Sequence, residues 1–148
     1  MCIRDSVKAL HLLKSFKLPD GLNCASLNAL IMTYPYETKI ELNIFLENFS
    51  NLKSFSLCGI TINNDIVSMI SKLHLLEFIS LYHCKWTNDQ LEKILKDCTN
   101  LQEILLLQCH YSMEISIKLP PQLKRFEIQY STSRIEIDAS LCTQLSCL

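Results

Sequence analysis

Cysteine, histidine and glutamate side chains that could do chemistry are spread along this chain of 148 residues. Its eight cysteines could form disulfides, and His83-Cys84 with Cys109-His110 offers two thiolates and two imidazoles, a set that binds zinc when it converges. Within each pair, however, the histidine is the neighbour of the cysteine along an expected strand, so the two side chains point to opposite faces. We therefore expect no metal site, and no other cofactor.

Catalysis has little support in the sequence. It contains no G-x-S-x-G motif, no glycine-rich phosphate loop and no H-E-x-x-H motif. Glu103 and Glu127 are expected on one sheet face but in different rows, which suits solvated charges better than a paired acid and base. We expect that the chain is not an enzyme.

A recurring pattern, L-x-x-L-x-L-x-x-C/N, dominates the sequence and supplies the elements that must position any site. Three apolar residues alternate or nearly alternate within it, which predicts a short strand with one buried face. Each unit is then one strand plus a return segment, and it cannot bury its apolar face without its neighbours. The pattern is strong in the last four complete units and weaker before them. Its starts are Val7, Leu27, Leu52, Leu76, Leu101, Leu123 and, broken off, Leu145.

The return segments between the expected strands are of two kinds. Three carry apolar residues spaced i, i+3, i+4, i+7, which predicts helices with apolar faces in residues 42–49, 66–73 and 91–98. Thr87 and Gln90 form a capping-box pattern before the last of these. Residues 112–122 are short and contain Pro120 and Pro121, so we expect extended chain or a single 3₁₀ turn there.

The pattern and its period resemble the leucine-rich repeat family. The resemblance implies an α/β fold, a curved solenoid with a parallel β-sheet on its concave face and helices or extended segments on its convex face. It covers residues 7–148 as about six units plus a truncated seventh. Residues 1–6, Met-Cys-Ile-Arg-Asp-Ser, look like a translated sequencing adaptor. We expect the array to be a fragment of a longer protein.

Cys84 and Cys109 occupy the ninth position of the pattern, where the family uses an inward asparagine or cysteine to bond the turn after the strand. Buried free thiols of this kind favour a reducing compartment, the cytoplasm or nucleus. The net charge is −1, no basic stripe is present, and no apolar run approaches the roughly 20 residues that span a bilayer. Neither nucleic acid nor a membrane is therefore an expected partner.

With the anchors pointing into the core, positions three, five, seven and eight are expected on the concave sheet face. Apolar and aromatic residues gather there beside charges, which is typical of surfaces that bind another protein or a peptide. The oligomeric state stays open. The predicted partner-binding residues are Phe78, Ser80, Tyr82, His83, Glu103, Leu105, Leu107, Arg125, Glu127 and Gln129.

Three functions stay open at this point. The ladder cysteines and the approach Asp-Cys-Thr-Asn-Leu over residues 97–101 are similar to the repeat arrays of F-box receptors of ubiquitin ligases, where the concave face captures a substrate protein. Residues 119–123, Leu-Pro-Pro-Gln-Leu, look like the sensor arrays of NLR-type immune receptors. The array could instead be a spacer. We expect the first, and an upstream F-box or P-loop domain in the complete gene would decide between the first two.

Overall fold

The computed structural model describes residues 9–13, 27–33, 49–111, 115–129 and 135–146, and it is a mixed α/β structure. Residues 1–6 and most of the first predicted helix lie outside this described part. The main sheet contains β1 (Ala9–Leu13), β2 (Ala29–Thr33), β3 (Ser54–Cys58), β4 (Phe78–Tyr82), β6 (Glu103–Leu107) and β9 (Arg125–Gln129). The remaining elements are α1 (Asn64–Ile70), α2 (Asn88–Asp97), β5 (Lys85–Trp86), β7 (His110–Tyr111), β8 (Ile115–Lys118) and β10 (Ile135–Asp138).

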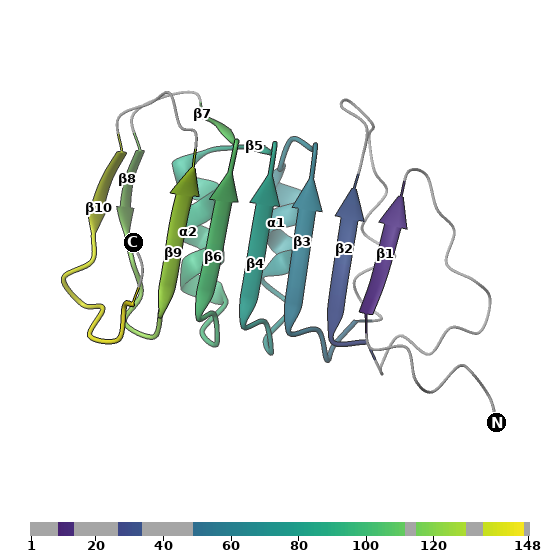
Figure 1. The fold of residues 1–148 in the computed structure, drawn as a ribbon, viewed down its shortest axis with the longest axis horizontal. Coiled ribbons are helices and arrows are strands. Elements are labelled where there is room, and N and C mark those ends of the chain that lie inside the picture. Colours follow the sequence, from purple (N-terminus) through teal and green to yellow (C-terminus); the bar gives the residue numbers. More distant parts are fainter. Residues whose placement is uncertain (1–8, 14–26, 34–48, 112–114, 130–134, 147–148) are drawn as a thin grey trace.

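The six strands of the main sheet are parallel and lie side by side in chain order, with β1 at one edge and β9 at the other (Figure 1). Every strand spans positions three to seven of the sequence pattern. Position three pairs with position three throughout, as in Ser54 with Phe78 and Glu103 with Arg125. The pattern therefore predicted both the strands and their register.

The core lies between this sheet and the layer behind it. Positions four and six of the central strands are at most 1% exposed, and the first-position leucines at 27, 52, 76, 101 and 123 are fully buried. Ile104 and Leu106 are both 0% exposed, whereas Leu105 between them is only half-buried on the other face. A register shifted by one residue would reverse this arrangement. The predicted choice of buried face is confirmed.

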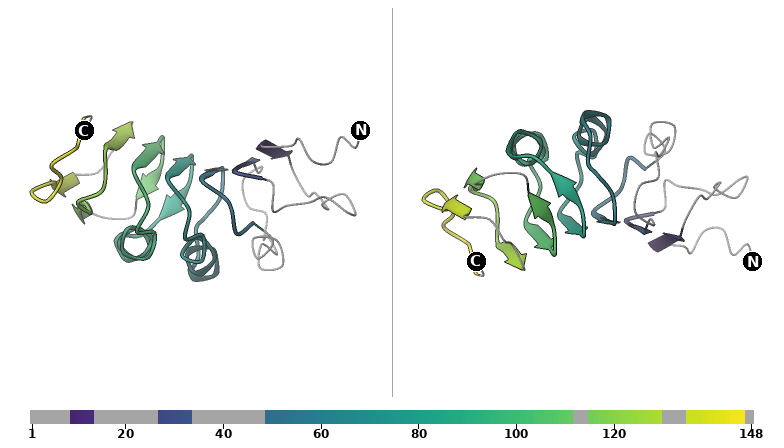
Figure 2. Two further views of the ribbon diagram at one scale, coloured as in Figure 1. Left: turned by 90° about the horizontal axis from the view of Figure 1, so that it is seen from below. Right: turned by 90° about the horizontal axis from the view of Figure 1, so that it is seen from above.

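The two described helices lie on the same side of the sheet, behind the strands in Figure 1 and projecting from one face in Figure 2. Each begins at a side-chain cap. The Ile66 N–H donates to Asn63 Oδ1 at 2.9 Å at the start of α1. The Thr87 N–H donates to Gln90 Oε1 at 2.9 Å in the capping box of α2, as predicted. The apolar stripes of both helices are buried against the sheet.

In the described part of the return after β6, residues 115–122 include a strand and no helix, in line with the prediction from the two prolines. Residues 115–118 form β8, which pairs in parallel with β10 in a small sheet that lies beside β9 in Figure 1 and is displaced toward the helix side in Figure 2. A second small sheet joins β5 to β7 just beyond the carboxyl ends of β4 and β6. Because β8 replaces a helix, the layer behind the main sheet changes from helical to extended beyond α2.

The repeating register continues to the last described residues. Position-two N–H groups donate to the position-two carbonyl of the preceding unit, as from Gln102 to Glu77 at 2.8 Å. The Ser146 N–H makes the same bond to the Lys124 carbonyl, also at 2.8 Å, and this places Leu145 at position one of a seventh unit. Among the described residues, no helix is long and apolar enough to span a membrane.

Candidate interaction surface

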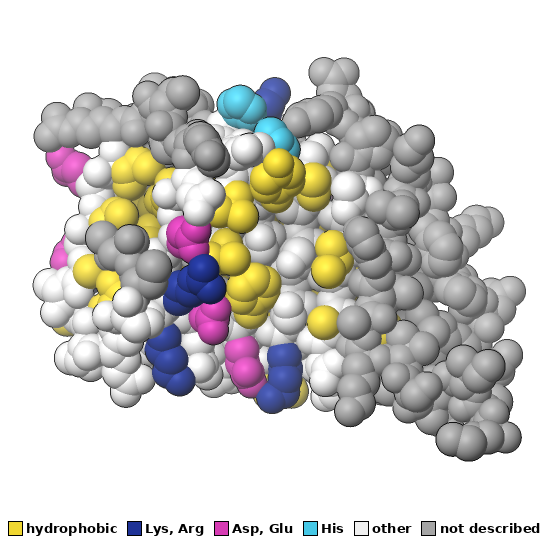
Figure 3. Space-filling model, in the orientation of Figure 1, with side chains coloured by type: hydrophobic (Ala, Val, Ile, Leu, Met, Phe, Trp, Pro, Cys, Tyr) yellow, Lys and Arg dark blue, Asp and Glu magenta, His cyan; other side chains and the backbone are white. Residues whose placement is uncertain are grey.

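The face of the main sheet opposite the helices carries the side chains at positions three, five and seven, and we call it the open face. In the part of the chain that the structure describes, the helices and the back strands all lie on the other side of this sheet (Figure 2). The open face faces the reader in Figure 3, where apolar side chains gather near the centre and a charged stripe runs beside them. All ten predicted partner-binding residues except His83 belong to its strands.

An apolar patch occupies the centre of the open face, on β4 and β6. Tyr82 is paired with Leu107 and Ser80 with Leu105 across the two strands, and Phe78 lies one pair further toward their amino ends. Tyr82 is 37% exposed, and the other apolar members are half-buried because they pack on neighbours across the strands. The structure thus brings Phe78, Tyr82, Leu105 and Leu107 together, as the sequence predicted.

A charged cluster borders the patch on β6 and β9. Arg125 Nη2 lies 2.7 Å from Glu127 Oε2, and Nη1 lies 3.9 Å from Glu103 Oε2, so one guanidinium bridges two carboxylates. The Gln129 side-chain amide donates to the second oxygen of Glu127. The cluster has one positive and two negative charges, so it presents a net charge of −1 beside the apolar patch. Its geometry suits recognition by charge and does not resemble an acid and base converging on a substrate.

His83 is a correction to the sequence analysis. It was predicted on the sheet face, but it stands after the end of β4 with φ 51°, in the left-handed region, and Gln108 after β6 has the same φ. Gly59 after β3 also has positive φ, 79°. Position eight thus turns the chain inward so that position nine enters the core. The His83 ring packs edge-on against Tyr82, with centroids 4.3 Å apart, at the rim of the patch.

The ladder cysteines occupy this inward position. Cys84 Sγ lies 3.5 Å from the Leu57 carbonyl oxygen, and Cys109 Sγ lies 3.3 Å from that of Leu81, so each thiol reaches the strand of the preceding unit. Burial raises the pKa of the Cys84 thiol to about 12 and also raises that of Cys109. The neutral S–H form therefore persists at physiological pH and can donate these bonds.

The reason given above for expecting no zinc site is partly wrong. Cys84 and Cys109 do not lie in strands. His83 is separated from Cys84 by its own left-handed turn, whereas His110 follows the buried Cys109 as the first, exposed residue of β7. Groups of three or more possible metal ligands do not occur among the described residues. The described cysteines, at positions 58, 84, 98, 109 and 142, are free thiols.

The sequence analysis did not predict a functional role for two surface features. Ile31 on β2 is 42% exposed and extends the apolar character of the open face toward β1. Its place at position five of the unit predicted that it lies on this face. The spacing of the pattern does not predict how exposed the side chain is. A groove on the helix side of the sheet was not foreseen at all, because it depends on how two return segments pack. Trp86 on β5 is buried.

No protein-family model, curated protein or solved structure matches this chain.

Proposed function

We propose that this chain is a leucine-rich repeat solenoid that binds another protein or a peptide through its open face. The observation that carries the proposal is the apolar patch of Phe78, Tyr82, Leu105 and Leu107, which lies beside charged residues on a sheet face where no described element packs. Aromatic and aliphatic side chains held by a rigid sheet lose little conformational entropy on binding, and aromatic anchors contribute much of the energy of interfaces.

The charges beside the patch define the partner more closely. Arg125 is already engaged by Glu103 and Glu127, which leaves the cluster with an excess negative charge. A partner that adds a basic side chain would satisfy this excess, whereas an acidic side chain would meet like charge. We infer a segment with an apolar or aromatic residue that packs on Tyr82 and Leu107 and a lysine or arginine beside it.

The ladder geometry supports the choice between the receptor classes. The thiols at position nine donate to carbonyl oxygens of the preceding strand. This cysteine-ladder form is similar to the repeat arrays of F-box receptors. We therefore propose the substrate-receptor arm of an F-box ubiquitin ligase, acting in the cytoplasm or nucleus, where the ladder thiols stay reduced. Long-read sequencing of the complete transcript tests this, since an upstream P-loop domain in place of an F-box would favour an NLR-type sensor.

Peptide display on the purified chain tests the binding itself. Selection against the wild type, with counter-selection on a Tyr82→Glu, Leu107→Glu double variant, should enrich peptides that combine an apolar or aromatic residue with an adjacent lysine or arginine. Individual peptides should lose at least about tenfold in affinity for the variant, because the substitutions place charge in the apolar contact.

A Leu75→Glu variant is the matched control. Leu75 is also an exposed apolar residue, 43% accessible, but it precedes β4 and is not a member of the open face. Binding should survive this substitution. Peptides that bind all three proteins equally, or a selection that yields no saturable binder, would argue for the spacer function.

A further inference from the structure

The edge of the molecule at the carboxyl ends of β4 and β6 is basic. Histidine and basic side chains gather there in Figure 3, next to the apolar side chains of the patch. Lys85 on β5 and His110 on β7 are exposed, and the ring of the half-buried His83 packs edge-on against Tyr82. We call Lys85, His110 and His83 the basic edge. It is continuous with the apolar patch, because His83 contacts a member of that patch.

The repeat places the two exposed members of the basic edge side by side. Lys85 and His110 both take position ten of their units, and they are register partners in the parallel pair of β5 and β7. The next residue, Trp86, is buried, so alternation along β5 turns the Lys85 side chain outward. Thr61 takes position ten in the preceding unit and bridges to Lys85. A hydroxyl, an ammonium group and an imidazole therefore form one exposed row.

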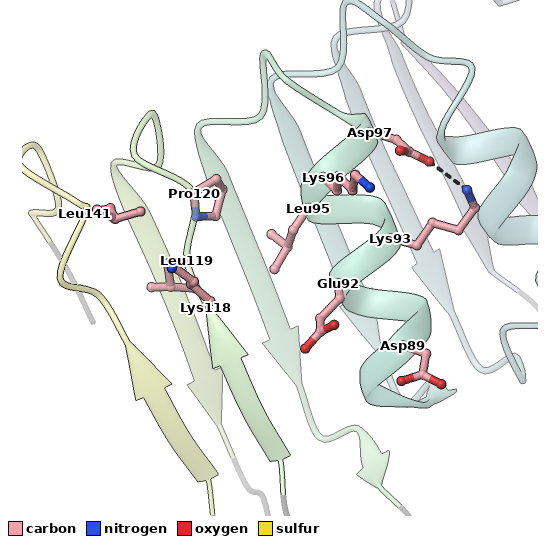
Figure 4. Close-up of a pocket in the computed structure, with 10 residues that line it drawn as sticks. All are labelled: Asp89, Glu92, Lys93, Leu95, Lys96, Asp97, Lys118, Leu119, Pro120 and Leu141. Atoms are coloured by element: carbon pink, nitrogen blue, oxygen red, sulfur yellow. Dashed lines mark hydrogen bonds and ion pairs between the residues drawn. The ribbon is translucent and has the colours of Figure 1, made fainter.

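The Lys85 ammonium group has no anionic partner, in contrast to a lysine at the other end of the strands. There Lys53 Nζ lies 2.8 Å from Glu77 Oε1. Within the described ranges, the side chains of Lys85 and His110 make no hydrogen bond and no ion pair, and no acidic residue occupies position eight or ten. Asp89 stands in the first turn of α2, on the helix side of the sheet (Figure 4). The donors of the basic edge are thus available to an incoming anion.

The two ends of the open face carry opposite charge. The charged cluster on β6 and β9 has an excess negative charge and begins at position three, whereas the basic edge follows position seven. Glu103 and Leu107 are four residues apart on β6, about 13 Å at roughly 3.3 Å per residue. The apolar patch extends from the cluster to the basic edge. An extended segment of about five or six residues can therefore reach all three.

We propose that the basic edge receives an aspartate or glutamate side chain of the partner through Lys85 and His110. The bound segment then lies along β4 and β6, with its basic residue at the charged cluster, its apolar residue on the patch and its acidic residue at the basic edge. A carboxylate accepts hydrogen bonds from an ammonium group and from an imidazole N–H. The inference rests on the proposed function and deepens it, because it adds an acidic residue to the partner and fixes the order of its contacts.

Parallel peptide display on the wild type and on a Lys85→Glu, His110→Glu double variant tests this order. The displayed peptides are fused through their carboxyl ends, so only a side chain can supply the carboxylate. The wild-type pool should combine an apolar residue with a basic residue on one side and an acidic residue on the other. The pool from the variant should keep the apolar residue and replace the acidic residue by lysine or arginine. Equal enrichment of acidic residues in both pools would overturn the proposal.

A matched pair of variants separates the contact from the change in net charge. Lys85→Glu should weaken the binding of amidated peptides from the wild-type pool about fivefold in fluorescence anisotropy, because an exposed ion pair is replaced by like charges. Lys96→Glu makes the same change in charge on α2, on the helix side (Figure 4), and should leave the affinity unchanged. A peptide whose acidic residue is replaced by lysine should bind Lys85→Glu more tightly than it binds the wild type. Equal weakening by both variants would contradict a contact at Lys85.

A small probe tests the basic edge without a selected peptide. N-acetyltryptophan joins an aromatic ring to a carboxylate, and N-acetyltryptophanamide lacks the charge. In amide NMR spectra of the full chain, the first compound should shift the signals of Lys85 and His110 saturably, at concentrations on the order of millimolar, and the second should not. Equal shifts with both compounds, or none with either, would overturn the proposal. A failed selection together with the expected NMR shifts would count against the proposed function alone, so the two failures are distinguishable.

Discussion

Leu105 and Leu106 are adjacent, identical in type and on opposite faces of β6, and this pair provides the sharpest test of the register. Leu106 is fully buried, so its replacement by alanine removes the transfer free energy of the lost methyl groups and leaves a cavity between the sheet and the helical layer. Such substitutions cost 2–5 kcal/mol, and we expect about 3 kcal/mol here.

Leu105→Ala should cost much less. The Leu105 side chain is half-buried on the open face, so solvent fills the space that the substitution leaves and no internal cavity forms. Losing about half of the burial of one leucine corresponds to roughly 1 kcal/mol. The expected difference between the two variants, about 2 kcal/mol, is a substantial fraction of the 5–15 kcal/mol that stabilises a typical domain.

Urea unfolding followed by tryptophan fluorescence measures this difference. The chain has a single tryptophan, Trp86, which is 4% exposed and pairs with Tyr111 of β7, the strand that follows β6, and so reports on this part of the fold. With a slope of about 2 kcal/mol per molar urea, Leu106→Ala should lower the midpoint by roughly 1.5 M and Leu105→Ala by roughly 0.5 M. Equal shifts, or a larger shift for Leu105→Ala, would refute the assignment of faces on which the candidate surface depends.

Three further predictions concern the caps, the thiols and the exposed charges. Asn63→Ala removes the side-chain acceptor of the Ile66 N–H and should cost about 1 kcal/mol in urea unfolding, while Asn64→Ala, one residue later and exposed, should cost less than half of that. Stability should be constant below pH 9 with respect to the Cys84 thiol and should fall between pH 9 and about 12, because the unfolded thiol, with its usual pKa of 9.0, ionises while the folded thiol stays protonated. In that range Cys84→Ser should show a shallower fall, by up to about 1.4 kcal/mol per pH unit, and an unchanged slope would contradict the burial of the thiol. Lys53→Ala should change the unfolding free energy by less than about 0.5 kcal/mol, although Lys53 Nζ lies 2.8 Å from Glu77 Oε1, because both side chains are about half exposed. A loss above about 1 kcal/mol would contradict the small contribution expected of an exposed ion pair.

Much of the fold was predictable because its units are local and repeated. The apolar positions four and six, the helical spacing before Leu95 and the prolines at 120 and 121 each specify an element through the side chains of that element alone. Repetition then fixes how the elements pair, since identical units stack with identical positions in contact. This is why the strands, the buried face and the patch around Tyr82 followed from spacing.

The turn at position eight did not follow from spacing. His83 and Gln108 are not residues that demand positive φ, and only Gly59 signals it by type. Their left-handed conformation is imposed by the need to bring Cys84 and Cys109 beneath the preceding strand, where each thiol reaches a carbonyl oxygen. The burial of the cysteine at position nine therefore outweighs the preference of His83 and Gln108 for negative φ.

The sequence by itself determined the strands of the main sheet, the buried face of β2, β3, β4, β6 and β9 and the side chains that share the open face, because alternation along a strand has a period of two and admits one register. Tertiary structure alone decided the bridge from Arg125 to Glu103 and Glu127, the exposure of Ile31 and the existence of a groove between α2 and the segment after β8. These features depend on distances between segments that follow different paths behind and across the sheet. Such distances are set when all layers pack together, so no single unit of the sequence contains them.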